Sequence, residues 1–327
     1  MTVAALTIDA RRLWAGEQAV GQALAFIDLD ATREWPDDLV LSPCPVIGLG
    51  APGHPLAGRL DAVVEAPVSA AALVHQVMAR PQAAAVSAQL LRLLPGAETG
   101  AALIAESLAY GLLQGSAEHH AWLDRRPVAE PASSPGRVAL DRTGSRLTIT
   151  LDRADHGNAI DTAMRDGLRE AFAAAALDTG IERVELKASG RSFCLGADLT
   201  EFGTTRDPAS AHAIRMQTLP APMIAACASR LAARVQGACI GAGLEMAAWA
   251  RRIVAAPDAW FQLPELAMGL LPGAGGCVSL SRRIGRQRTA LMLLSAKRIP
   301  ARIALDWGLI DGIEGNLAAD EGQRDIS

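Results

Sequence analysis

Two glutamates with apolar neighbours are the first candidates for chemistry in this sequence. Glu245 lies between Leu244 and Met246, and Glu265 follows the largely apolar run 261–264. A carboxylate in apolar surroundings needs a partner or takes a raised pKa, and either suits acid–base work near neutral pH. The alternative for each is a helix-end carboxylate, which the helix dipole favours. We favour the alternative of a simple helix-end carboxylate less, because each glutamate lies next to a glycine-rich turn in the sequence.

Two of these turns can supply backbone hydrogen-bond donors. Residues 192–199 (SFCLGADL) and 237–245 (GACIGAGLE) each lead from an expected strand toward an expected helix. Their small residues let backbone N–H groups approach a ligand closely. Two N–H groups that meet at one point form an oxyanion hole, which stabilises the enolate formed when a thioester gains or loses a proton at Cα. A third segment places Glu265 shortly before the glycine loop 272–276.

Strands and helices alternate in the part of the chain that must position these residues. Residues 137–151 predict a hairpin, because 146–151 alternates polar and apolar and 141–144 has turn chemistry. Further strands are expected at 184–187, at 233–235 and near 253–255. Helices are expected to begin near Thr162, Ala209, Gly243, Gly275 and Arg286. Such alternation favours βαβ-type units with helices that cover the sheets.

The residues before this core divide into two regions. Residues 1–68 carry β-like runs at 25–27, 46–49 and 62–64 and a helix expected over 10–23, which predicts a small α/β unit. Residues 69–136 consist of Ala- and Leu-rich helices interrupted by Pro81 and Pro95, and end in a proline-rich linker, 127–136. Residues 48–53 fit a dinucleotide-binding GxGxxG, but Pro52 and Pro55 oppose the required helix. We therefore expect a glycine-rich loop.

Composition limits the functional classes. Half of the 327 residues are hydrophobic and 20% are charged, which is typical of a globular chain with a buried core. The formal net charge of −4 offers no general attraction for nucleic acid or acidic membranes. Arginines 282, 283, 286 and 288 are interpreted as a solvated helix face, with a phosphate contact as the alternative. The five cysteines lack metal or disulfide spacing. Residues 1–12 lack the long apolar core of a signal peptide, and no apolar run reaches the length needed to span a bilayer. We expect a soluble, cytoplasmic protein without a metal.

Residues 146–310 closely resemble the enoyl-CoA hydratase/isomerase (crotonase) superfamily. The blocks that carry the resemblance are, in chain order, 191–199, 241–245, 263–265, 272–276 and 298–310, and residues 152–159 resemble the early CoA-contacting loop. The resemblance implies an α/β fold with a crotonase-type spiral of stacked ββα units at 137–327, preceded by an extra α/β and helical region. It also implies an acyl-CoA substrate, no cofactor other than the CoA of that substrate, and a homo-oligomer, trimer or hexamer.

The resemblance also implies roles for individual residues. The N–H groups of Ala197 and Ala242 would hold the thioester oxygen, and the N–H of Gly273 would brace the site. Glu245 and Glu265 would hold the water that adds to Cβ, while Glu265 protonates Cα. CoA would contact Asn158, Ala159, Leu195, Ala197, Asp198, Leu199 and Thr200. The presence of both glutamates favours syn hydration of an enoyl-CoA. Isomerisation, thioester hydrolysis and a non-catalytic acyl-CoA-binding subunit are the alternatives.

The two ends of the chain depart from the family pattern. Family members usually continue past the closing block with helices that complete the CoA pocket, whereas only 311–327 follows it here. Residues 86–127 are similar to those terminal helices, so we predict that they dock on the core from the front of the chain. Trp122 and Arg125 are then candidates to cover CoA, with a surface helix end as the alternative. His119 and His120 lack partners at metal spacing and are expected on a solvated helix face.

Overall fold

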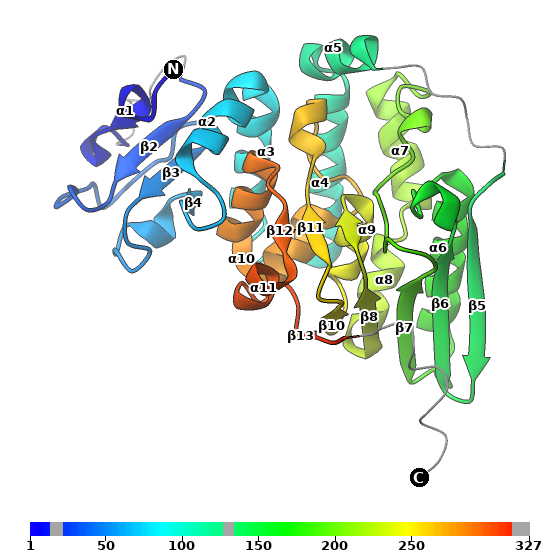
Figure 1. Ribbon diagram of the computed structural model, residues 1–327. Helices are drawn as coiled ribbons and strands as arrows, with labels where there is room; N and C mark the ends of the chain where they lie inside the picture. The colour runs from blue at the N-terminus through cyan, green and yellow to red at the C-terminus, as the bar shows by residue number, and fades with distance from the viewer. Residues whose placement is uncertain (14–21, 127–133, 316–327) are drawn as a thin grey trace.

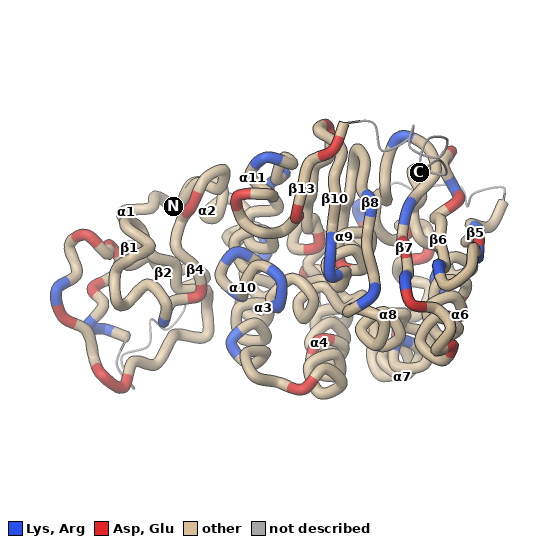
Figure 2. The backbone as a smooth tube through the Cα atoms, turned by 90° about the horizontal axis from the view of Figure 1, so that it is seen from below, with Lys and Arg blue, Asp and Glu red and all other residues tan. Residues whose placement is uncertain are grey.

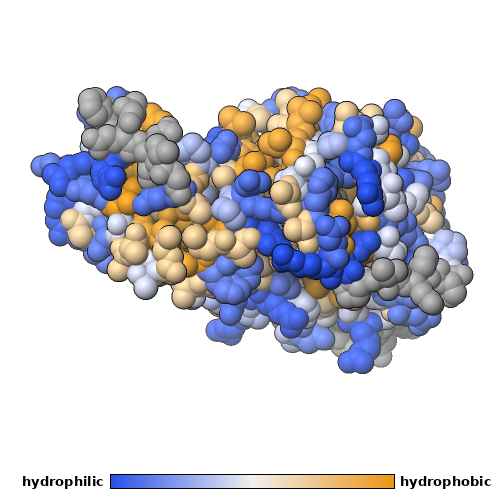
Figure 3. All heavy atoms as spheres, turned by 90° about the horizontal axis from the view of Figure 1, so that it is seen from above, coloured by the Kyte–Doolittle hydropathy of each residue, from blue (hydrophilic) through white to orange (hydrophobic). Residues whose placement is uncertain are grey.

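Three β-sheets lie in a row along the molecule, with helices between and over them (Figure 1). The computed structural model describes residues 1–13, 22–126 and 134–315. In these residues the first sheet has the strand order β1-β2-β3-β4, the second β13-β10-β8-β7-β6-β5 and the third β12-β11-β9. Seen from above, a notch in the outline separates the smaller lobe, which carries the first sheet, from the larger body (Figure 3).

The first sheet is parallel and belongs to the small lobe. Its strands are β1 (Thr7–Ile8), β2 (Ala25–Asp28), β3 (Val46–Leu49) and β4 (Ala62–Val63), accompanied by α1 (Val3–Leu6) and the 3₁₀ helices η1 (Ala10–Leu13) and η2 (Ala57–Arg59). The strands expected at 25–27, 46–49 and 62–64 are confirmed. The loop expected after β3 is also confirmed, because turns and η2 follow that strand. The helix expected over 10–23 is seen only as η1, since residues 14–21 lie outside the described residues.

Alternation along β2 explains why this sheet is buried on both faces. Phe26 packs into the main apolar core, whereas Ala25 and Ile27 pack into a smaller cluster on the other side. Successive side chains of a strand point to opposite faces, so a continuous apolar run is needed here. Among the described residues, no helix combines the length and apolar content needed to cross a bilayer.

Four helices join the first sheet to the rest of the molecule. They are α2 (Ala70–Ala79), α3 (Pro81–Leu93), α4 (Thr99–Gln114) and α5 (Ala117–Arg125), and they confirm the helical prediction for this region. Pro81 opens α3, a position where its missing N–H costs no hydrogen bond. Ser69 and Ser116 cap α2 and α5 through their hydroxyl oxygens. Helix α4 packs against helices of the larger body, namely α7, α8 and α10.

The second and third sheets form the core of the larger body. The second contains the antiparallel hairpin β5 (Arg137–Thr143) and β6 (Arg146–Asp152), followed by the parallel strands β7 (Arg183–Ala188), β8 (Leu231–Val235), β10 (Arg252–Ala255) and β13 (Gly312–Ile313). The third contains β9 (Ala238–Ile240), β11 (Trp260–Gln262) and β12 (Ile299–Pro300). The chain therefore passes from one sheet to the next between β8 and β9, and the expected hairpin and strands are confirmed.

Helices cover these sheets and begin close to the expected positions. They are α6 (Thr162–Leu177), α7 (Pro208–Thr218), α8 (Ala221–Cys227), α9 (Ala242–Ala247), α10 (Gly276–Ser295) and α11 (Ala301–Asp306). The helix expected to begin near Arg286 is the second half of α10. The two halves meet at Gly285, whose φ of 80° and ψ of 155° interrupt the helical geometry. Short 3₁₀ helices also occur, including η4 (Leu199–Glu201) and η6 (Glu265–Met268).

The arginines of α10 bind other parts of the chain. Arg282 is exposed, as a solvated face predicts, but that interpretation is wrong for the other three, which are partly buried. Figure 2 shows these basic positions along α10, beside α3. Arg288 forms an ion pair with Glu65 at 2.8 Å, and Arg286 donates to the carbonyl oxygen of Gly58 at 3.0 Å. Arg282 donates to the hydroxyl of Thr99 and the carbonyl oxygen of Ala97. Arg283 donates to the carboxylate of Asp311 and to the carbonyl oxygens of Leu309 and Ala250. These guanidinium groups connect α10 to the small lobe and to the end of the core, because each reaches an acceptor brought close by the fold.

Candidate active site

A cavity of about 850 Å³ opens between the core and the helices α4, α5 and α7. It is lined by both glycine-rich turns, by the loop after β11 and by residues of these three helices. Eight of the predicted site residues line it: Leu195, Ala197, Asp198, Leu199, Ala242, Glu245, Glu265 and Gly273. The structure thus brings together residues from four separate segments of the sequence. Asn158, Ala159 and Thr200 are not among the residues that line it.

The two glycine-rich turns touch each other. A Cβ atom on Gly241 would lie 3.7 Å from Cα of Gly196 and 2.7 Å from Oε1 of Glu265. Gly196 and Gly241 have φ angles of 94° and 48°, a region that favours glycine. Only a residue without a side chain fits at 241, so the close approach of this turn to the second glutamate depends on glycine.

Each turn presents an N–H group without a partner in the described part of the chain. The N–H of Ala242 is the first in α9 and therefore has no acceptor within its own helix. Ala197 sits in a short bridge to Ile160 that uses the carbonyl of Gly196 and the N–H of Asp198, leaving the N–H of Ala197 unused. Both alanines line the cavity. Two free donors on adjoining turns are the arrangement that an oxyanion hole requires.

Glu245 is buried and held by the loop that precedes α10. Its Oε2 atom accepts hydrogen bonds from the N–H groups of Ala274 at 2.7 Å and Gly276 at 2.9 Å. Burial raises the pKa of Glu245 to about 7, and the two hydrogen bonds limit that rise. A carboxyl group with a pKa near 7 can both accept and donate a proton at neutral pH.

Glu265 is the second buried carboxyl group of the cavity wall. It begins η6, immediately after Pro264, and only 7% of its surface is exposed. Its Oε2 atom has no hydrogen-bond partner among the described residues. Burial and the negative charge of Glu245 raise the pKa of Glu265 well above its ordinary value. The raised pKa favours the protonated form of Glu265, and its Oε2 atom is available for a ligand.

A third buried carboxyl group, Glu106, was not recognised in the sequence. It comes from α4, and its two oxygens accept hydrogen bonds from the N–H groups of Gly275 at 2.7 Å and Cys277 at 2.8 Å. Glu106 and Glu245 therefore bind alternate N–H groups at the start of α10. Burial and the charge of Glu245 raise the pKa of Glu106. The available signal was the spacing of Glu106, Tyr110 and Gln114, which places three polar residues on one face of an apolar helix.

Gly273 lines the cavity, as expected. The N–H groups that bind Glu245 belong to Ala274 and Gly276, and a bracing role for the N–H of Gly273 stays a prediction. A Cβ atom on Gly273 would overlap the ring of Tyr110. Glycine at this position allows helix α4 to pack directly against the loop that holds Glu245.

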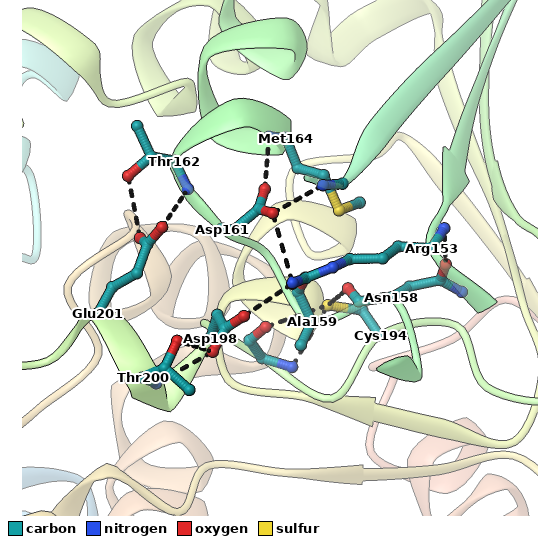
Figure 4. Close-up of polar contacts among 12 residues, drawn as sticks. Arg153, Asn158, Ala159, Asp161, Thr162, Met164, Cys194, Asp198, Thr200 and Glu201 are labelled. Carbon is teal, nitrogen blue, oxygen red and sulfur yellow. Dashed lines mark hydrogen bonds and ion pairs between the residues drawn. The ribbon is translucent and has the colours of Figure 1, made fainter. Parts of the chain in front are cut away.

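The predicted CoA loop is held together by the buried arginine Arg153 (Figure 4). Its guanidinium group pairs with Asp198 at 2.8 Å and with Asp161 at 3.5 Å. Burial alone would raise the pKa of Asp198, but hydrogen bonds from Thr200 and Arg153 lower it below its ordinary value. Thr200 donates to Asp198 at 2.7 Å. This network fixes the segment that contributes Leu199 to the cavity.

Asn158 has a structural position in this loop. It is fully buried with a φ of 56°, and its Oδ1 accepts from the N–H of Arg153 at 2.8 Å. Its Nδ2 donates to the carbonyl oxygens of Ser189 and Ser192. These bonds occupy its side chain, so a direct contact between that side chain and CoA does not fit the geometry. The carbonyl of the neighbouring Ala159 is likewise occupied by Arg153.

Helix α5 covers one side of the cavity, as expected for residues 86–127. Trp122 lines the cavity, stacks on His119 at 5.6 Å between ring centroids and meets Phe202 edge-on at 5.9 Å. The expectation for His119 is wrong, because it is buried and its Nδ1 lies 2.9 Å from the carbonyl oxygen of Met268. Burial lowers its pKa.

Arg125 was expected to help cover CoA, but its side chain is exposed. The adjacent Arg126 lies over the ring of Trp122 at 5.7 Å and donates to the carbonyl oxygens of Leu199 and Phe202. A shift of one residue at the end of a helix moves a side chain by about 100° around the axis, which accounts for the difference.

Comparisons with known proteins agree with this geometry. The family described as enoyl-CoA hydratase/isomerase matches residues 142–319. The chain is 35% identical over 182 residues to 2,3-dehydroadipyl-CoA hydratase of Escherichia coli, covering 54% of this chain and 68% of that protein. It is 33% identical to mevalonyl-coenzyme A hydratase of Beauveria bassiana, covering 54% and 67%. The crystal structure of enoyl-CoA hydratase from Bacillus anthracis superposes with a TM-score of 0.50 at 27% identity, covering 54% and 70%.

Proposed function

The chain belongs to the enoyl-CoA hydratase/isomerase family, and from that premise we propose that it adds water to the double bond of an α,β-unsaturated acyl-CoA thioester. The observation that carries the proposal is the pair Glu245 and Glu265. Both are buried, both line one cavity and both have a raised pKa. Several relatives at about this level of identity are named as hydratases, which supports the same reaction type.

In this proposal the thioester oxygen accepts hydrogen bonds from the N–H groups of Ala197 and Ala242. These donors lie on the two touching turns and have no other partner in the described ranges. Addition of water at Cβ moves electron density onto the thioester oxygen, and donors that are already in place stabilise that charge without reorganisation. Removal of one such donor in other enzymes costs about two to three orders of magnitude in kcat.

The glutamates would manage the water and its proton. A water held between Glu245 and Glu265 adds to Cβ, and Glu265 supplies the proton to Cα on the same face, which gives syn addition. Glu265 suits this role because its raised pKa favours the protonated form and its Oε2 has no competing partner in the part of the chain described. The pKa of Glu245, about 7, suits a group that takes up the proton of the water.

We also propose that α4 and α5 close the CoA-binding cavity from within the same chain. Tyr110, Gln114, His119 and Trp122 of these helices line the cavity together with the core residues. Residues that precede the core in sequence thus occupy a place beside its active-site loops. This arrangement supports the view that helices usually found at the end of the family's chains stand at the front of this one.

A spectroscopic assay tests the proposal. Incubation with crotonyl-CoA is expected to remove the absorbance of the conjugated thioester, and Glu265→Gln is expected to slow this loss at least 100-fold, the lower range for a general acid. Glu170→Gln, at an exposed position of α6, serves as the matched control and is expected to retain full activity. No loss of absorbance with any enoyl-CoA would contradict hydration. Release of free CoA thiol would indicate hydrolysis instead.

A further inference from the structure

Arg215 of α7 is a cation in the cavity wall that has only neutral hydrogen-bond partners. Its Nε donates to the hydroxyl of Ser107 at 3.0 Å, its Nη2 to the carbonyl oxygen of Ser107 at 3.0 Å, and its Nη1 to Oε1 of Gln114 at 3.0 Å. Its guanidinium carbon lies 4.5 Å from the centroid of the Tyr110 ring. Within the described ranges, no carboxylate oxygen lies within 4.0 Å of it in an ion pair.

Two other arginines that are wholly or partly buried have a carboxylate partner. Arg153 faces Asp198 at 2.8 Å, and Arg92 faces Asp61 at 2.6 Å. A cation partly removed from water without a counter-charge is destabilising, and the partial burial of Arg215 lowers its pKa. The acidic residue that acts on it through space is Glu106, which is itself bonded to the start of α10. Arg215 therefore retains an unmatched positive charge.

The guanidinium group also retains donors. A guanidinium carries five N–H groups, and the three bonds to Ser107 and Gln114 leave two of them unused. Arg215 lines the cavity, as do its helix neighbours Ala211 and Ile214. A planar pair of donors suits a carboxylate, which accepts two parallel hydrogen bonds.

The ring of Tyr110 relates the position of Arg215 to the loop that binds Glu245. One side of its ring packs on Gly273, next to the loop that binds Glu245, and Arg215 lies over the ring. The ring of Tyr110 thus contacts both Arg215 and the residue that precedes Ala274 in that loop. Arg215 and Glu245 line the same cavity, so Arg215 is within the space open to the acyl chain of a substrate whose Cα and Cβ lie beside Glu245.

We infer that Arg215 binds a carboxylate at the far end of the acyl chain, so that the preferred substrates are CoA thioesters of dicarboxylic acids. The inference rests on the proposed function, because it places the acyl group in the same cavity. It adds a substrate class that neither the two glutamates nor the two free N–H groups determine. The bound carboxylate supplies the counter-charge that the protein itself does not provide.

Binding of saturated thioesters tests the inference separately from the hydration reaction. Calorimetric titration with adipoyl-CoA and hexanoyl-CoA compares two ligands that differ in the terminal carboxylate alone. We expect the protein to bind adipoyl-CoA roughly 10- to 100-fold more tightly, as for a charge-assisted hydrogen-bonded pair. Arg215→Met is expected to remove this preference while changing the affinity for hexanoyl-CoA less than about threefold, because the neutral chain makes no use of the charge.

Two further variants control for folding and for general electrostatics. Arg215→Lys keeps the charge but loses the paired donors, and is expected to retain part of the preference. Arg165→Met is the matched control: Arg165 also lines the cavity but already pairs with Asp166 at 2.8 Å. Its loss is expected to leave the ratio of the two affinities unchanged.

Three results would overturn the inference: equal affinity of the unaltered protein for the two thioesters, an undiminished preference in a folded Arg215→Met variant, or no binding of either thioester. If Arg215→Met does not fold, the inference is tested by the ratio of the two affinities in the unaltered protein and in Arg215→Lys. A clear preference for adipoyl-CoA in a protein that fails to hydrate any enoyl-CoA would refute the proposed reaction and leave the carboxylate site standing.

Discussion

Replacement of Glu245 by glutamine is expected to change how the stability of the protein depends on pH. The two hydrogen bonds that hold this side chain both end on Oε2, from Ala274 and Gly276. A glutamine carbonyl oxygen can accept the same two bonds, so Glu245→Gln removes the charge and little else. The substitution thereby isolates the energetic effect of burying an ionisable group.

The size of the effect follows from the pKa. Burial raises the pKa of Glu245 from 4.5 to about 7, so the folded protein binds this proton more tightly than the unfolded chain. The resulting stabilisation is fully present below pH 4.5 and is lost as the pH rises through 7. At about 1.4 kcal/mol per pKa unit, the loss amounts to about 3 kcal/mol. The charge of Glu245 also raises the pKa of Glu265 and Glu106, so its removal eases their ionisation too.

Urea unfolding at a series of pH values measures this quantity. The free energy of unfolding of Glu245→Gln minus that of the unaltered protein is expected to be near zero at pH 4.5. It is expected to rise to about 3 kcal/mol in favour of the variant at pH 8. Glu170→Gln, an exposed control on α6, is expected to show a small and constant difference. A difference that does not change with pH for Glu245→Gln would refute the argument that this carboxyl group is desolvated.

Three other substitutions test the packing around the site. Glu106→Gln cannot keep both bonds, because they end on different oxygens, and the orphaned N–H of Cys277 is expected to destabilise the protein by about 1–3 kcal/mol in urea unfolding. An unchanged midpoint would mean that this residue does not hold the start of α10. Gly276→Ala places a methyl group against the side chain of Glu245 and is expected to lower kcat while the protein remains folded, as checked by circular dichroism. Arg153→Met leaves two carboxylates unpaired and is expected to cost about 3–5 kcal/mol, and a loss below 1 kcal/mol would show that the ion pairs are not essential.

The local elements of this protein could be predicted because their causes lie close together in the sequence. Glycines with positive φ at 196 and 241 mark the turns, and the alternating pattern of 146–151 marks a strand. Apolar neighbours around Glu245 and Glu265 indicate burial, and burial indicates a raised pKa. None of these inferences needs knowledge of which distant segment lies nearby.

Other assignments failed because they depend on distant contacts. The arginines of α10 have the spacing of a solvated face, yet each meets an acceptor from another part of the chain, such as Glu65 for Arg288. Asn158 has the position of a ligand contact in the family pattern, but its side chain is used up by three main-chain groups. A sequence shows that a side chain can form hydrogen bonds, but it does not show which partner the fold places beside that side chain.

The sequence by itself thus predicted the candidate chemistry, since two carboxyl groups and two glycine-rich turns are complete within short segments. Only the tertiary structure decided what surrounds that chemistry. Glu106 at the start of α10 comes from α4, and Arg215 in the cavity wall comes from α7; they lie 139 and 30 residues from Glu245 in the sequence. The charge and hydrogen bonding of a buried site depend on every group within a few ångströms, and the packing of helices on the core sets those distances.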